Sequence, residues 1–315
     1  MKSNFFALLA LTISIAITPP CPLSAQTFNA SDPASCGYSL TFADDFKNLE
    51  KIDTRATGKP GFNWYTKQFF GGKPTPSAVI ETGKGGLTLN GPNGYNGSIS
   101  TAGPAANADG YVGTVFSGGG YFEASIAFDR SLIDVRHGFP AFWSMAIEHM
   151  AQKGKSQWEG QPPGFEHFIE VDFFEANTFA KAGPDTYSGA VHDWYGAWSK
   201  ERGFSEAMNP NYIIHVPRNT DFAKFHRYGC LVVPSSKSNG WIGFIQYYFD
   251  GLPSSDICTW TGNQLPGTPP PSGDRKYSIT DADHLNVLLG CGDGDKMHVK
   301  YVRVWQIPPP ATSAP

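Results

Sequence analysis

Short runs of apolar or alternating residues recur along the whole chain, separated by clusters of glycine, proline and asparagine. Segments of this kind are typical of β-strands. No long amphipathic helix interrupts them, although FSEAMN at 204–209 is compatible with one helical turn. The ten predicted strands are 38–46, 85–91, 120–128, 140–147, 167–175, 212–216, 228–233, 241–251, 286–290 and 298–306.

Two of these segments alternate with period two. In GYFEASIAF (120–128) the odd-numbered residues share one face and the even-numbered residues share the other. In HVKYVRVWQ (298–306) the odd-numbered residues from Val299 to Trp305 oppose Lys300, Val302 and Val304. Strands with one core face and one open face are typical of antiparallel sheets. Because the strands are spread evenly with no composition break, the sequence predicts one all-β sandwich of two antiparallel sheets.

The first 25 residues are typical of a secretory signal peptide. Lys2 precedes an apolar run, and LSA at 23–25 is a suitable cleavage site. Cys21 suggests a lipoprotein as the alternative, although it follows two prolines rather than small residues. We therefore expect a secreted, extracellular or periplasmic protein. Its expected parts are a signal peptide at 1–25, a lead-in at 26–37, the main domain at 38–306 and a Pro-rich tail at 307–315.

Cleavage would remove one lysine and no acids, so the net charge becomes 23 − 28 = −5. No block of basic residues stands out, which argues against nucleic acid and anionic membranes as partners. We expect a monomer. Four cysteines would remain without a C-x-x-C pair, which argues against a zinc site. One or two disulfides or buried thiols are the alternatives for Cys36, Cys230, Cys258 and Cys291.

The segment HFIEVDFFEAN (167–177) places three acids in an otherwise apolar strand. Glu170 and Asp172 point to the same face of a regular strand, and Glu175 points to the opposite face. One β-bulge at Phe173-Phe174 would return Glu175 to the face of the other two. We therefore predict a bulged strand with three carboxylates in a row on one side.

Three adjacent carboxylates are costly unless they are used, because like charges raise at least one pKa. Glycoside hydrolysis needs one ionised carboxylate and one protonated carboxyl group, about 5 Å apart in a retaining enzyme. A calcium site and a solvated strand face are the alternatives for such a cluster. The flanking phenylalanines argue against the solvated face.

EVDFFE resembles the bulged E-x-D-x-x-E signature of glycoside hydrolase family 16. Seven further segments resemble that family in the right order, over residues 38–306: LTFADDF, GGGYFEASIAF, HGFPAFWSM, GAVHDW, FHRYGCLVV, YYFDG and VKYVRVWQ. The resemblance implies a laminarinase-like, concanavalin A-like β-jelly roll with a cleft on the concave sheet. It also implies endo-acting polysaccharide hydrolysis with retention of configuration.

Position by position, the resemblance makes Glu170 the nucleophile and Glu175 the general acid and base, with Asp172 orienting the nucleophile. It assigns Trp143 and His192 to substrate binding. Trp194 is expected to share the strand face of His192 and is a further candidate for substrate binding. An aromatic ring suits the apolar C–H face of a sugar. Ordinary packing is the alternative for each of these three residues.

Several segments depart from the family pattern. Lys300 occupies a position where the family often has an acid that helps to bind structural calcium, so we expect no metal and no cofactor. An insertion at 144–169 includes Trp158, which is either a sugar platform or a loop anchor. Trp64 and Tyr65, in GFNWYT, either rim the cleft or pack in the core. Val232 replaces the tryptophan of the family motif F-H-x-Y-x-x-x-W.

The sequence thus predicts a secreted endo-glycosidase, with a β-1,3- or mixed-linkage β-glucan as its expected substrate. Galactan hydrolases share the bulged signature, and a transglycosylase would use the same residues. A lectin-like binding protein is the alternative from another class, because this fold also serves in lectins. The presence of all three acids favours the enzyme.

Overall fold

The structure of the chain is a computed structural model. The expected signal peptide (1–25) and residues 309–315 of the expected tail lie outside the residues that it describes. The described residues are 28–69, 73–77, 80–83, 85–91, 97–107, 110–133, 140–147, 166–176, 183–199, 201, 203–208, 212–240, 242–261, 279, 281, 283–291 and 296–308.

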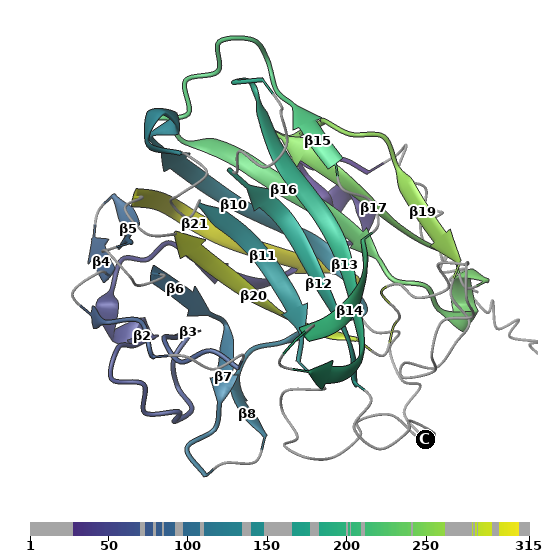
Figure 1. The fold of residues 1–315 in the computed structure, drawn as a ribbon. Helices are drawn as coiled ribbons and strands as arrows, with labels where there is room; N and C mark the ends of the chain where they lie inside the picture. Colours follow the sequence, from purple (N-terminus) through teal and green to yellow (C-terminus); the bar gives the residue numbers. More distant parts are fainter. Residues whose placement is uncertain are drawn as a thin grey trace, which may run out of the picture.

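Two large sheets and one small two-stranded sheet, of β7 (Ala102–Pro104) and β8 (Tyr111–Gly113), are present in the described part of the chain, and Figure 1 shows the two large sheets as stacked layers. Sheet A has nine strands: β1 (Ser39–Asp44), β4 (Ile80–Gly83), β5 (Gly86–Asn90), β10 (Gly120–Phe128), β16 (His226–Val233), β17 (Ile242–Phe249), β18 (Leu252–Pro253), β19 (Cys258–Thr261) and β21 (Lys296–Gln306). Its central order is β18-β17-β16-β10-β21-β5-β4.

Sheet B has ten strands in the order β14-β13-β12-β11-β20-β6-β3-β2, with β15 beside β13 and β9 beside β20. They are β2 (Ile52–Asp53), β3 (Trp64–Tyr65), β6 (Gly97–Ser100), β9 (Phe116–Ser117), β11 (Ala141–Ala146), β12 (Glu166–Glu175), β13 (Thr186–Ser199), β14 (Gly203–Met208), β15 (Tyr212–His215) and β20 (His284–Cys291). The short elements are β7 (Ala102–Pro104), β8 (Tyr111–Gly113), η2 (Pro33–Cys36), η3 (Leu49–Lys51), η5 (Arg130–Leu132) and η6 (Lys237–Asn239).

The core lies between the two sheets, where the inward side chains of both form one apolar cluster. Phe122 of sheet A stacks on Phe173 of sheet B with ring centroids 4.7 Å apart. All described strand pairs are antiparallel except the short pair β2–β3. All ten predicted strands are present, and the predicted all-β sandwich of two antiparallel sheets is confirmed.

The predicted helical turn at 204–209 is wrong, because Gly203–Met208 forms strand β14, which pairs with β13. Local residue preference is weak here, and pairing with the long neighbouring strand decides the conformation. In β21, Val299 faces the core with Val302 and Val304, not the opposite side as predicted. The cause is a β-bulge at Lys300, where two residues of β10 face three of β21.

The prediction that β10 has one open face is wrong, because all nine residues of the strand are buried. A second apolar cluster covers this face with side chains from the N-terminal residues 28–38. Phe28 contacts Tyr121 and Tyr248 with ring centroids 4.9 Å and 5.6 Å apart. The lead-in thus closes the outer surface of sheet A at this point.

The expected disulfides are not formed, since no bond joins any two of the four described cysteines. They lie in four different elements: Cys36 in η2, Cys230 in β16, Cys258 in β19 and Cys291 in β20. Cys230 and Cys291 are buried in the core, which agrees with the alternative of buried thiols. Burial raises the pKa of Cys230, so its thiol stays protonated at neutral pH.

Candidate active site

The predicted β-bulge lies in β12 and is confirmed by the pairing on both sides of the strand. Toward β13, Asp172 pairs with Ala190 and Glu175 pairs with Ser188, so three steps along β12 match two along β13. Toward β11, the register shifts at the same place. Phe173 and Phe174 are both buried in the core. One extra residue thus sends two consecutive phenylalanines inward and brings Glu175 to the face of the other acids.

Paired residues in adjacent strands share a face, so the register also defines the neighbours of the acids. Glu170 pairs with Met145, Asp172 with Trp143 and Glu175 with Ala141, all in β11. The three acids therefore lie along the outer face of sheet B, beside the row of β11 side chains. Asp172 is 3% exposed, whereas Glu170 and Glu175 are partly exposed.

Two ring nitrogens of β13 reach two of the acids. The indole Nε1 of Trp194 donates a hydrogen bond of 2.7 Å to Glu170 Oε2. His192 Nε2 lies 2.9 Å from Asp172 Oδ2. The two rings are stacked with centroids 5.8 Å apart. Because the rings support each other, a shift of one would disturb the contacts of both acids.

An apolar floor of Met145, Phe168 and Leu288 supports the site, and Trp143 and Trp194 pack against it. These three residues were not singled out from the sequence. Met145 lies two positions after Trp143, and Phe168 lies two positions before Glu170, so the period of the strands could have identified both. Leu288 pairs with Trp143 across strands that are distant in sequence, and no local sequence pattern predicts this contact.

Space beside Trp143 is kept open by small residues. Gly290 lies next to Ala141 across the β11–β20 pair. A Cβ atom at Gly290 would lie 3.5 Å from Ser98 Cβ and 4.0 Å from the indole nitrogen of Trp143. A larger side chain at Gly290 would approach the indole nitrogen of Trp143.

The remaining predicted residues are Trp158, Trp64 and Tyr65. Trp158 and most of the 144–169 insertion lie outside the described residues. Trp64 and Tyr65 are 0% and 1% exposed, so the interpretation as core residues is confirmed for both. Trp64 donates a hydrogen bond of 3.0 Å to Asp44 Oδ2, which satisfies its buried N–H group.

Among the described side chains, no group of three or more histidines, cysteines and acids has the geometry to hold a metal ion. In the same part of the chain, no helix has both the length and the apolar character needed to cross a bilayer.

In comparisons with known proteins, this chain shows only distant similarity to solved structures. No protein-family model and no curated protein matches the sequence. Among solved structures, the κ-carrageenase from Pseudoalteromonas carrageenovora, in complex with an oligotetrasaccharide of κ-carrageenan, is 14% identical, with 85% of this chain and 94% of that chain covered and a TM-score of 0.48. LamAcat from Zobellia galactanivorans is 14% identical, with 86% and 99% covered and a TM-score of 0.43. The carbohydrate recognition domain of Emp46p is 8% identical, with 71% and 84% covered and a TM-score of 0.38.

Proposed function

We propose that the protein is a secreted, retaining, endo-acting glycoside hydrolase whose site is the outer face of β12. The observation that carries the proposal is the β-bulge, which places Glu170, Asp172 and Glu175 on one face of sheet B. No structural requirement of a sandwich explains three carboxylates there, since the same strand buries Val171, Phe173 and Phe174 on its other face.

Glu170 is the nucleophile in this proposal. Its carboxylate attacks the anomeric carbon while Glu175, protonated, gives its proton to the departing glycosidic oxygen. The C–O bond of the glycoside breaks and an ester to Glu170 forms. Glu175, now ionised, then removes a proton from a water molecule, whose oxygen displaces Glu170 and releases a sugar of the original configuration.

The spacing along β12 supports these roles. With one residue taken up by the bulge, Glu170 and Glu175 are four strand steps apart, or about 13 Å between their Cα atoms. Two glutamate side chains that lean toward each other close most of that span. The proposal requires the carboxyl groups to reach the separation of about 5 Å that retaining enzymes use.

His192 and Trp194 have positioning roles in this proposal. The sequence suggested that both bind substrate, but their ring nitrogens contact Asp172 and Glu170. The indole N–H donor favours the ionised form of Glu170, which a nucleophile needs. Trp143 is the ring on this face that is best placed to stack on a sugar, beside the open row at Ala141 and Gly290.

The expected substrate is a neutral β-1,3- or mixed-linkage β-glucan, reached after export by the 1–25 leader. The first experiment measures reducing-sugar release by purified residues 26–315 from laminarin, lichenan, agarose, κ-carrageenan and xyloglucan. We expect release from laminarin or lichenan, and its loss in Glu170→Gln. No release from any of the five, with binding intact, would favour a lectin-like protein instead.

Stereochemistry tests the mechanism separately. We expect the first product to keep the anomeric configuration of the bond that is cut, because in this proposal Glu170 attacks the anomeric carbon directly and water displaces it in a second step. Proton NMR of the product before mutarotation reads this directly. An inverted product would eliminate Glu170 as nucleophile. A longer oligosaccharide in place of free sugar would indicate transglycosylation through the same intermediate.

A further inference from the structure

A groove lies on the outer face of sheet A, on the opposite side of the sandwich from the three acids. It encloses about 370 Å³, which is within the usual range for small-ligand sites. The strand register builds its floor, because Glu81 pairs with Thr88, Thr88 with His298 and His298 with Ala127. Four adjacent strands (β4, β5, β21 and β10) thus present one continuous row of side chains to the groove.

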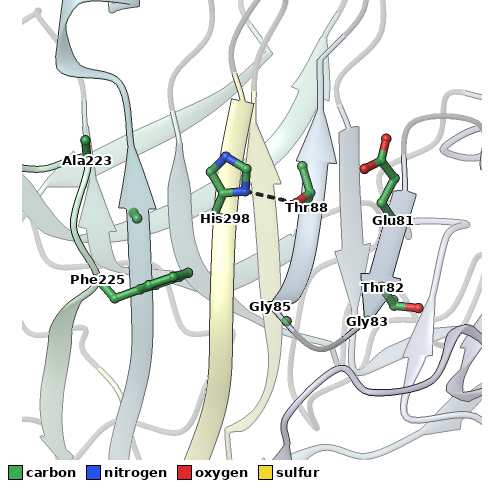
Figure 2. A pocket seen from close by; sticks show the side chains of 10 residues that line it. Glu81, Thr82, Gly83, Gly85, Thr88, Ala223, Phe225 and His298 are labelled. Atoms are coloured by element: carbon green, nitrogen blue, oxygen red, sulfur yellow. Dashed lines mark hydrogen bonds between the residues drawn. The ribbon is translucent and has the colours of Figure 1, made fainter.

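Figure 2 shows how the side chains lie around this row. His298 and Thr88 are joined by a hydrogen bond of 2.9 Å between Nδ1 and Oγ1, and Glu81 and Thr82 stand on the β4 side. Phe225, from the segment before β16, extends its ring toward the strand that carries His298. This phenyl ring is 41% exposed. A large exposed ring beside polar groups marks a surface that gains from being covered.

The lining has the chemistry that recognises a sugar. The phenyl ring offers an apolar surface for the C–H face of a pyranose. A carboxylate, two threonine hydroxyls and an imidazole offer hydrogen-bond acceptors and donors for sugar hydroxyl groups. Among the described lining residues, Glu81 is the acid and none is a lysine or an arginine. A carboxylate disfavours anionic ligands, so the set suits a neutral saccharide.

We propose that this groove is a second, non-catalytic binding site for a neutral saccharide, with Phe225 as its stacking ring and Glu81, Thr88 and His298 as its polar contacts. Its position on sheet A means that it does not compete with the outer face of sheet B for the same sugar units. On a long polysaccharide, a second contact raises the effective concentration of chain near the enzyme. The site does not depend on the proposed hydrolysis.

The test is affinity electrophoresis of Glu170→Gln protein, which keeps polysaccharide intact, in gels that contain laminarin, lichenan, agarose or κ-carrageenan. We expect at least one of the three neutral polysaccharides to slow migration. Adding Phe225→Ala lowers the association constant on the order of tenfold, and Thr88→Val lowers it less. Leu252→Ala is the matched control, because Leu252 is 71% exposed on β18 at the far edge of sheet A.

The outcomes separate this site from the active site. Phe225→Ala alone, in otherwise wild-type protein, leaves the hydrolysis rate on a short soluble oligosaccharide unchanged. If the protein hydrolyses nothing but its retardation still depends on Phe225, the groove stands and the proposed hydrolase fails. The groove proposal is overturned if no neutral polysaccharide slows migration, or if Phe225→Ala and Leu252→Ala migrate alike. Retardation by κ-carrageenan alone would overturn it too.

Discussion

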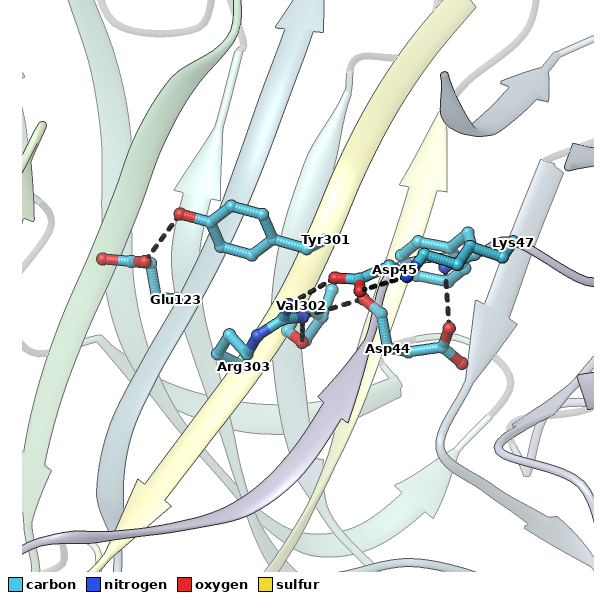
Figure 3. Close-up of polar contacts among 8 residues, drawn as sticks. Asp44, Asp45, Lys47, Glu123, Tyr301, Val302 and Arg303 are labelled. Atoms are coloured by element: carbon cyan, nitrogen blue, oxygen red, sulfur yellow. Dashed lines mark hydrogen bonds and ion pairs between the residues drawn. The ribbon is translucent and has the colours of Figure 1, made fainter. Parts of the chain in front are cut away.

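The outer faces of the two sheets both carry carboxylates held by aromatic side chains. On sheet B, Trp194 and His192 contact Glu170 and Asp172. On sheet A, Glu123 of β10 accepts hydrogen bonds of 2.9 Å from the hydroxyl groups of Tyr121 and Tyr301. Figure 3 shows the second of these, with Arg303 nearby in an ion pair with Asp45. From the strand patterns alone, the two faces look alike.

The two faces differ in what covers them. Glu123 is 3% exposed, because Tyr121 lies over it and the N-terminal segment packs on Tyr121 in turn. Gly229 makes this arrangement possible, since a Cβ there would lie 2.1 Å from the Tyr121 hydroxyl. Glu170 and Glu175 are partly exposed instead. A single covered carboxylate with two hydroxyl donors and the guanidinium of Arg227 4.0 Å away is a structural device, whereas two partly exposed carboxylates on one face remain available for chemistry.

The largest expected effect comes from replacing one glutamate by glutamine on each face, which separates a catalytic carboxylate from a structural one. Glu170→Gln removes the nucleophile, so we expect turnover to fall by at least about 10⁴-fold, with the melting temperature nearly unchanged. Glu123→Gln is the matched control and keeps turnover within about twofold. It destabilises the fold by about 1–3 kcal/mol, since the amide needs partners that the carboxylate did not. Reducing-sugar assays and thermal melts measure both.

Equal losses of activity in Glu170→Gln and Glu123→Gln would break the comparison, because the effect would then follow from the fold and not from the site. Wild-type turnover in Glu170→Gln would remove Glu170 from the mechanism.

The middle acid of β12 should matter less than its neighbours. Asp172→Asn keeps the shape but removes the charge that faces His192, so we expect turnover to fall about 10²-fold, while circular dichroism shows that the fold is kept. The pH profile of turnover should differ from that of wild type, because His192 then faces a neutral amide in place of a carboxylate. An unfolded variant would show that Asp172 is structural.

The sequence predicted the strands and the bulge because both depend on local patterns. Period-two alternation identifies a strand, and E-x-D-x-x-E leaves one extra residue between the second and third acids. The bulge at Lys300 carries no such mark, since a lysine there fits a regular exposed position as well. It comes from the pairing of β21 with β10 across some 170 residues of chain.

The contacts of the site were less predictable than its residues. The strand period placed His192 and Trp194 on one face, but which acid each ring reaches depends on the register of β13 against β12. The covering of β10 likewise depends on residues 28–38, which lie more than 80 positions earlier. Long-range pairing therefore decides which acids are exposed, and the sequence alone does not reveal it.

The positioning role of Trp194 predicts a smaller effect. Trp194→Phe keeps an aromatic ring between Phe168 and His192 but removes the N–H donor to Glu170 Oε2. A hydrogen bond to a charged group contributes about 1.5–3 kcal/mol, so we expect turnover to fall at least tenfold. The acidic limb of the pH profile should shift to higher pH, because the ionised form of Glu170 loses a donor.

The shift of the acidic limb of the pH profile distinguishes a role of Trp194 in positioning Glu170 from a role in packing. A lower melting temperature with an unmoved pH profile would mean that the indole acts through packing alone. Trp143→Phe serves as control, because we expect it to raise KM and to leave the pH profile unchanged.

The smallest effect concerns stability on the other face. Burial raises the pKa of Glu123 above its ordinary value of 4.5, although the two tyrosine hydroxyls oppose the shift. Above pH 4.5 the unfolded chain loses this proton before the folded protein does. The free energy of unfolding of wild type therefore falls relative to that of Glu123→Gln until the pH exceeds the pKa of Glu123 in the folded protein. We expect the stability difference between the two, from urea unfolding at pH 4 to 7, to move in favour of the variant as pH rises. A difference that stays constant or moves the other way would mean that burial does not raise the pKa of Glu123 in the folded protein.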